Sequence, residues 1–143
     1  MRYYKISVPI NASHNFCPES GEKNAHFHTF NICLLLKKLS EDFIEFDRAE
    51  EVVRIYFDKY RGKYLNSIPP FDQMLPTIEN MGNVFFYEFS ERLITTNFKL
   101  LQLEIGESLC AVYTISDSIE TNMLQYGKIQ QLYHVFTSNI FTE

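Results

Sequence analysis

Residues 4–14 read YKISVPINASH, and residues 26–37 read HFHTFNICLLLK. In the first stretch apolar residues occupy every second position, and His14 ends the row. In the second stretch His26 and His28 begin a similar row, which continues through alternate apolar residues. Because successive side chains of a strand point to opposite faces, this period of two predicts two half-buried β-strands.

The segment between these strands predicts how their histidines meet. Residues 15–25 contain Asn, Pro, Ser and Gly and are typical of a loop, so the two strands are expected to pair antiparallel and bring His14 near His26. Residues two apart on a strand share a face, so His28 should point the same way as His26. A single His-x-His pair also arises by chance, but three imidazoles with an open fourth position describe a catalytic zinc site.

Two helices are expected next. Asp47-Arg48-Ala49-Glu50 resembles a capping box with Asp47 as the N-cap, apolar residues recur behind it at helical spacing, and Gly62 is a plausible stop. Thr77 is predicted to cap a second helix with its own apolar stripe. Residues 97–105 and 109–116 then suggest a hairpin. The predicted order is ββααββ, an α+β domain with both helices on one face of an antiparallel sheet.

Composition and charge limit the class of protein. The chain has 143 residues, 45% hydrophobic residues and a net charge of -5, as expected for one globular domain. Without a basic cluster, nucleic acid is not expected as a partner, and no apolar run is long enough to predict a membrane span. The three cysteines, an odd number without framework spacing, are expected to be reduced, and a cytoplasmic location is the default expectation. Residues 1–116 are predicted to form the domain, with 117–143 as an extension of unknown role.

Several short motifs occur in a characteristic order. Ala12-Ser13-His14 is followed by Glu22-Lys23-Asn24-Ala25-His26-Phe27-His28, Phe46-Asp47, Tyr64-Leu65-Asn66, Pro76-Thr77-Ile78-Glu79-Asn80 and Leu103-Glu104. This series resembles the 6-pyruvoyl-tetrahydropterin and 6-carboxy-tetrahydropterin synthase family, which has the T-fold. The resemblance covers roughly residues 4–115.

The resemblance implies roles for particular residues. His14, His26 and His28 would bind one Zn²⁺, Glu104 would anchor a pterin ring through paired hydrogen bonds, and Thr77 would lie beside that ring. Structural alternatives are an exposed glutamate for Glu104 and an ordinary helix cap for Thr77. Members of this family act on 7,8-dihydroneopterin triphosphate and assemble as two stacked trimers, so a homohexamer and a small dihydropterin are the expected partners.

Three departures from the family pattern bear on catalysis. Glu22 occupies the position of the usual thiol; a carboxylate can act as a general base, and nearby Cys17 is a second candidate. Arg61 and Gly62 replace the Asp-His pair that transfers a proton, and an arginine cannot act as a base. Phe27 replaces the glycine between the two zinc histidines.

These departures leave two functions open. The first is a zinc-dependent carbon–oxygen or carbon–carbon lyase of pterin, queuosine or folate biosynthesis, with Glu22 as the base. The second is a non-catalytic paralogue that binds pterin or metal after losing the Asp-His pair. The retained histidines favour the enzyme, and the missing pair favours the binding protein.

Overall fold

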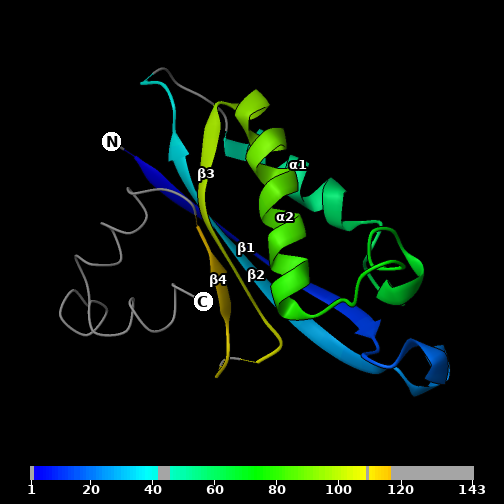
Figure 1. The fold of residues 1–143 in the computed structure, drawn as a ribbon. Helices are drawn as coiled ribbons and strands as arrows, with labels where there is room; N and C mark the ends of the chain where they lie inside the picture. The colour runs from blue at the N-terminus through cyan, green and yellow to red at the C-terminus, as the bar shows by residue number, and fades with distance from the viewer. Residues whose placement is uncertain (1, 42–45, 109, 117–143) are drawn as a thin grey trace.

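A computed structural model describes residues 2–41, 46–108 and 110–116 of the chain. It contains four antiparallel strands in spatial order β1-β2-β3-β4 and two helices that cover one face of the sheet (Figure 1). The elements are β1 (Tyr3–His14), β2 (His26–Lys38), α1 (Phe46–Phe57), α2 (Ile78–Arg92), β3 (Phe98–Gly106) and β4 (Tyr113–Ile115). This order confirms the predicted ββααββ arrangement and the α+β class.

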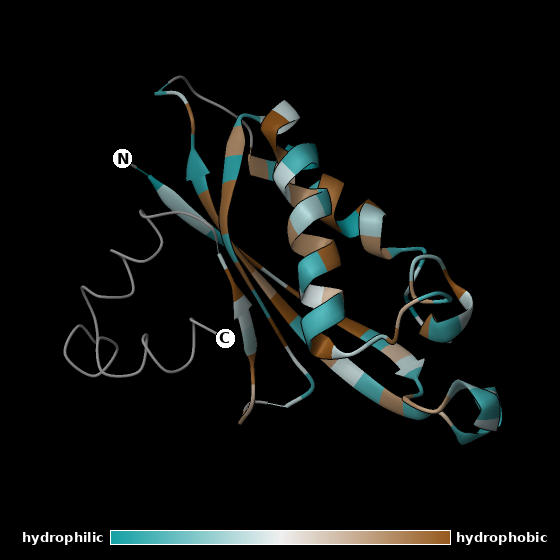
Figure 2. Cartoon of the chain, in the orientation of Figure 1, coloured by the Kyte–Doolittle hydropathy of each residue, from teal (hydrophilic) through white to brown (hydrophobic). Residues whose placement is uncertain are grey.

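The register of the first hairpin agrees with the predicted histidine arrangement. Directly paired residues of antiparallel strands point to the same face. His14 is the pairing partner of His26, and Ala12 is the partner of His28. The histidines thus extend one row of side chains on the helix-covered face, at the end of the hairpin next to loop 15–25. Figure 2 shows that this end of the molecule is mostly hydrophilic.

The core lies between this face of the sheet and the two helices. Aromatic rings form much of it: Phe57, Phe85 and Phe89 pack against one another with ring centroids 5.0–5.3 Å apart where Phe57 meets the other two. The strands contribute alternate residues to the same cluster, among them Ile6, Ile10, Phe30, Ile32, Leu34, Leu36, Leu103 and Ile105. Burial of these side chains, each stabilising by roughly 1.5–3 kcal/mol, holds the helices on the sheet.

The helix termini agree with the sequence in one case and differ in another. Thr77 is the N-cap of α2, and its hydroxyl accepts a hydrogen bond from the Asn80 amide, as predicted. The predicted N-cap Asp47 was wrong, because α1 already includes Phe46. Phe46 stacks on Tyr4 at 5.0 Å, so aromatic packing fixes this end of the helix. Gly62 has a φ of 69°, the left-handed conformation expected at a stop, although the regular helix ends earlier, at Phe57.

Some predictions fall outside the described residues. These are the extension 117–143 and residue 109, with which the second strand of the predicted hairpin begins. Cys17, Cys33 and Cys110 are all free thiols, as predicted. None of the described helices has the length and apolar character required to cross a bilayer.

Candidate metal and pterin site

His14 lies at the end of β1 and is 1% exposed. Its Nδ1 lies 2.7 Å from the carbonyl oxygen of Pro76, the residue that precedes the cap of α2. A carbonyl can only accept, so Nδ1 carries the proton and donates. The ring is therefore held in the tautomer that leaves Nε2 without a proton, which is the state a metal-ligating imidazole requires.

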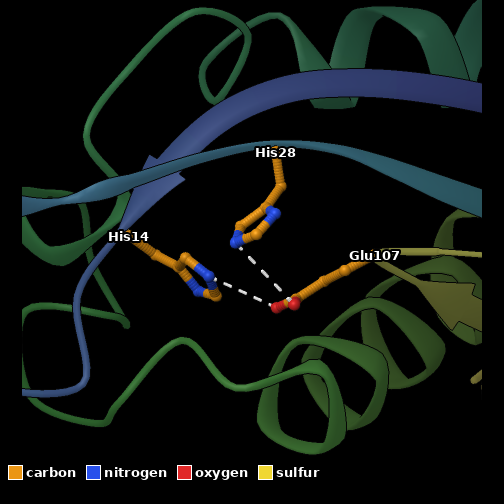
Figure 3. A group of neighbouring side chains, drawn as sticks. All are labelled: His14, His28 and Glu107. Atoms are coloured by element: carbon orange, nitrogen blue, oxygen red, sulfur yellow. Dashed lines mark ion pairs between the residues drawn. The ribbon is translucent and has the colours of Figure 1, made fainter.

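Three side chains from separate elements converge at this position (Figure 3). Nε2 of His14 lies 3.3 Å from one carboxylate oxygen of Glu107, and Nε2 of His28 lies 3.8 Å from the other. His14 comes from β1 and His28 from β2, whereas Glu107 follows the last residue of β3. The sheet therefore brings together residues that are up to 93 positions apart in the chain.

The electrostatics of this cluster suit a proton or a metal ion between its members. Burial lowers the pKa of His14, and the neighbouring His28 and His26 act in the same direction, whereas the Pro76 hydrogen bond and the Glu107 carboxylate oppose them. A neutral His14 with its proton on Nδ1 presents a lone pair to the Glu107 carboxylate. Two acceptors at 3.3 Å repel each other unless a proton or a metal ion lies between them.

The donor set fits a divalent metal. The ligand atoms of His14, His28 and Glu107 lie within 4.8 Å of one another. Two ligands that each lie about 2.0–2.2 Å from a tetrahedral zinc ion are themselves about 3.3–3.6 Å apart. The two histidine–Glu107 separations, 3.3 and 3.8 Å, are close to this range. Imidazole and carboxylate together are a ligand combination that zinc accepts in catalytic sites.

His26 lies beside this cluster but does not belong to it. Its ring centroid is 6.1 Å from that of His28, and its side chain is exposed. Because His26 pairs directly with His14 across the hairpin, its side chain emerges on the same face of the sheet. Of the three predicted ligands, the structure therefore brings His14 and His28 together, with His26 as their neighbour.

Glu104, the predicted pterin anchor, lies on the opposite face of the sheet. Its neighbours Leu103 and Ile105 are both buried in the core, so the alternation of the strand directs Glu104 away from the helices. There it accepts a hydrogen bond from Gln102 at 2.9 Å and pairs with Cys33 of β2. Within one chain, Glu104 is not brought to the histidines.

Sequence reasoning did not identify Glu107. The signal was present, because residues 103, 105 and 107 share a face if the strand alternation continues into the predicted turn 106–108. The core face of the last hairpin therefore ends in a carboxylate at the same end of the sheet as His14. The motif match to Leu103-Glu104 placed the expected carboxylate three residues too early for this face.

The two candidate catalytic residues lie in the loop between β1 and β2. Glu22 begins a short 3₁₀ turn, Glu22–Asn24, and its side chain is exposed. Cys17 is also exposed, and its thiol donates to the Glu19 carboxylate at 2.9 Å. This hydrogen bond and the negative charge of Glu19 raise the pKa of Cys17, so the reactive thiolate form is disfavoured.

The positions of the missing Asp-His pair lie along the free edge of β1. The Arg61 guanidinium donates to the Pro9 carbonyl at 3.0 Å and lies 3.6 Å from Asp58. The Gly62 amide donates to the Asn11 carbonyl at 2.6 Å. Both residues therefore attach this segment to the strand that carries His14, a structural role that needs no proton transfer.

Comparisons with known proteins agree with this architecture. The profile of the family described as 6-pyruvoyl tetrahydropterin synthase matches residues 4–118. The chain therefore belongs to the 6-pyruvoyl tetrahydropterin synthase family. No match was found among curated proteins.

Solved structures extend the comparison to the fold. The Caenorhabditis elegans 6-pyruvoyl tetrahydropterin synthase matches with a TM-score of 0.65 and 14% identity, over 82% of this chain and 96% of that one. A Plasmodium vivax 6-pyruvoyltetrahydropterin synthase, solved as a catalytic-residue mutant with glutamate replaced by alanine, matches with a TM-score of 0.57 and 15% identity, over 83% and 100% of the two chains. An uncharacterised protein from Wolinella succinogenes matches with a TM-score of 0.57 and 10% identity, over 82% and 100%. At these identities the likeness supports the T-fold.

Proposed function

We propose that this chain is a zinc-dependent lyase that acts on 7,8-dihydroneopterin triphosphate or a related dihydropterin. The observation that carries the proposal is the buried His14, whose unprotonated Nε2 faces the Glu107 carboxylate beside His28. Family membership supports a tetrahydropterin-synthase-like activity. The expected cellular location of such an enzyme is the cytoplasm.

His14 and His28 would hold the metal, with His26 as the proposed third imidazole. Its side chain would reach the metal from the same face of the sheet, because its backbone is paired directly with that of His14. A zinc ion bound there would polarise a side-chain oxygen of the substrate and so favour removal of the neighbouring proton. The Pro76 carbonyl would keep His14 in the ligating tautomer throughout.

If His26 supplies the third metal ligand, the Glu107 carboxylate is left available beside the ion, and it is a better candidate for the pterin anchor than Glu104. It occupies the same face as the histidines, whereas Glu104 faces the other way in the single chain. A carboxylate can accept two parallel hydrogen bonds from the 2-amino and ring N–H groups of a pterin. Thr77 directly follows Pro76, whose carbonyl accepts the hydrogen bond from His14, and is the proposed residue beside the ring.

Glu22 is the proposed general base, with Cys17 as a weaker candidate because its thiol is bound to Glu19. The similar Plasmodium vivax structure is described as a catalytic-residue mutant in which a glutamate is replaced by alanine. That description supports a glutamate as a catalytic residue here. In this scheme Glu22 removes a proton from the substrate side chain, and the electron pair expels the leaving group. Whether triphosphate or a carbon fragment leaves decides the class of lyase.

A hexamer of two stacked trimers is the proposed assembly. β1 and β4 form the edges of the described sheet, and pairing of edges between copies would add backbone hydrogen bonds along them. In such an assembly Glu104 could meet a site on a neighbouring copy. Its role is therefore decided in the same experiment as that of Glu107.

The activity test uses the zinc-loaded protein and 7,8-dihydroneopterin triphosphate, with pterin products separated by chromatography. We expect a new pterin product whose formation falls by about 10²–10⁴-fold in Glu22→Gln. Glu107→Gln should weaken substrate binding more than the matched variant Glu104→Gln. Equal effects of the two substitutions would contradict the assignment of Glu107.

A non-catalytic pterin-binding protein is the second candidate function. Arg61 and Gly62 support it, because both have structural contacts in place of the proton-transferring pair. This alternative predicts tight pterin binding, lost in Glu107→Gln, without any product in the same assay. Product formation that depends on Glu22 would reject it.

A further inference from the structure

The peptide unit that follows His14 is held by an asparagine from a distant segment. The Asn15 amide donates to Oδ1 of Asn66 at 2.8 Å, and Nδ2 of Asn66 donates to the Asn15 carbonyl at 2.8 Å. One side-chain amide thus satisfies both backbone groups of a residue 51 positions away. A pair of hydrogen bonds fixes orientation as well as distance, which a single bond does not.

Asn15 passes this constraint to the loop between β1 and β2. Its side chain donates to the Ser20 hydroxyl at 2.7 Å and to the Gly21 carbonyl at 3.1 Å, and it accepts from the Cys17 amide at 3.0 Å. Asn15 is 5% exposed and its hydrogen bonds are partly buried, so loss of a partner carries a cost in stability. Glu22 directly follows Gly21 and is therefore held through the same network.

The segment that carries Asn66 is itself fixed to β1. The Ser13 amide donates to the Lys63 carbonyl at 3.0 Å, and Ser13 forms a parallel bridge with Tyr64. Asn66 then lies in a short turn, Leu65–Ser67, whose first residue, Leu65, is buried. The segment 63–67 therefore contacts the chain on both sides of His14, at Ser13 and at Asn15.

We propose that Asn66 is a positioning residue, which fixes His14 and the Glu22-bearing loop relative to each other. The metal-related part of this inference rests on the proposed function; the part that concerns the loop does not. Without the Asn66 amide, the backbone after His14 loses two partners, and Asn15 loses the anchor that orients its own side chain. Both the ligand and the candidate base would then sample other positions.

The test uses the full chain with Asn66→Ala, Asn66→Asp and the control Ser67→Ala. Ser67 lies in the same turn, and within the described part of the chain its hydroxyl donates only to the local Tyr64 carbonyl, so its loss leaves the Asn66 contacts intact. Hydrogen–deuterium exchange is measured over residues 15–25, and the d–d absorption spectrum of bound Co²⁺ reports the geometry of the metal site. Asn66→Asp keeps the acceptor for the Asn15 amide but loses the donor to the Asn15 carbonyl, so its effect on exchange and on the Co²⁺ spectrum should be intermediate. This variant replaces Asn66→Ala in both measurements if Asn66→Ala does not fold.

We expect Asn66→Ala to raise exchange in residues 15–25 at least about tenfold while α2 stays protected. It should also alter the Co²⁺ spectrum and weaken Co²⁺ binding by about 10–100-fold, as loss of groups that orient ligands does elsewhere. Wild-type exchange in both Asn66 variants would overturn the proposal, as would faster exchange with an unchanged Co²⁺ spectrum and affinity. If the wild-type chain binds no Co²⁺, the proposed function fails, and the exchange measurement alone then decides the positioning of the loop.

Discussion

Two tyrosine hydroxyls in the core carry an unusual cost. Tyr56 and Tyr60 are 6% and 1% exposed. Among the described residues neither hydroxyl has a partner in hydrogen-bond geometry, although each lies near enough to affect the pKa of the other. Their rings pack well, with centroids 5.9 Å apart, so the aromatic part of each side chain contributes to the core. An unpaired buried hydroxyl cancels part of that contribution.

Removal of these hydroxyls should therefore not harm the fold. We expect Tyr56→Phe and Tyr60→Phe to leave the free energy of unfolding unchanged or to raise it by about 1 kcal/mol, because no formed hydrogen bond is lost. Urea unfolding at pH 7 measures this. A loss of 2 kcal/mol or more, on the scale of a broken buried hydrogen bond, would show that each hydroxyl has a partner after all.

The same two residues predict how stability depends on alkaline pH. Burial raises the pKa of both Tyr56 and Tyr60, so the folded state keeps protons that the unfolded chain releases near pH 10. Their contribution is present below about pH 10 and is lost as the pH rises further. The double variant Tyr56→Phe/Tyr60→Phe should show a shallower loss of stability between pH 9.5 and 11, measured by thermal unfolding. An unchanged slope would contradict the burial of these groups.

Individual residues were also where sequence reasoning was least complete. His14 and His28 were identified because a period of two fixes the face of a strand side chain. Glu107 was missed because it lies just beyond a strand, where a motif match and the strand alternation favoured different glutamates. Hydrogen bonds such as that from His14 to Pro76 join segments 62 residues apart and have no local signal.

At the level of elements, the contact between α2 and the last hairpin depends on a glycine. A Cβ at Gly82 would lie 2.7 Å from the Tyr113 ring and 3.1 Å from Ile105. The absence of a side chain thus lets β4 approach the helix, and the Tyr113 hydroxyl donates to Asn83 at 2.7 Å in the same contact. Close approach overrides helix propensity here, since alanine is normally preferred over glycine by about 1 kcal/mol in a helix.

Because of this contact, we expect a glycine-to-alanine substitution in α2 to lower stability, although the same substitution usually raises it in a helix. Gly82→Ala should destabilise the protein by about 1–3 kcal/mol, because crowding against Tyr113 and Ile105 outweighs the gain in helix propensity. Chemical unfolding measures the change, and Gly82→Ala combined with Tyr113→Ala should recover part of the loss by removing the crowded ring. Stabilisation by the single substitution would contradict the close packing of β4 on α2.

The strands and helices were more predictable than their ends. Apolar periodicity identified β1, β2 and both helices, and the Thr77 cap followed from local chemistry. The Asp47 cap failed because Phe46 is drawn into the aromatic cluster with Tyr4, a tertiary contact that local propensity does not contain. β4 is only three residues long, shorter than the hairpin pattern suggested.

At the scale of the whole molecule, the sheet that the structure describes is open and has two edge strands, β1 and β4. The C-terminal half of the β1 edge is partly covered by the segment that carries Gly62 and Tyr64. Pairing of the uncovered part of the β1 edge with β4 of another copy would join copies into the proposed hexamer. The candidate metal site, His14, His28 and Glu107, lies at one end of the sheet, and in the proposed assembly a neighbouring copy would contribute residues to it.

The proposed assembly has a direct measurement. Light scattering after size-exclusion chromatography should give a mass about six times the 16.9 kDa of the chain. A monomer at micromolar concentration would contradict the hexamer but not the proposed metal site within one chain.

Zinc should raise the melting temperature of the protein, since a ligand that binds only the folded state stabilises it, and chelation should reverse this rise.

His14 and His28 are proposed to hold one divalent metal ion beside Glu107. Zinc titration of the chelator-treated protein, followed by calorimetry at pH 7.5, measures this binding. We predict one ion per chain, with binding lost in His14→Ala and in His28→Ala and retained in Glu104→Gln. Absence of zinc binding, or binding that persists unchanged in both histidine variants, would show that these histidines do not form a metal site.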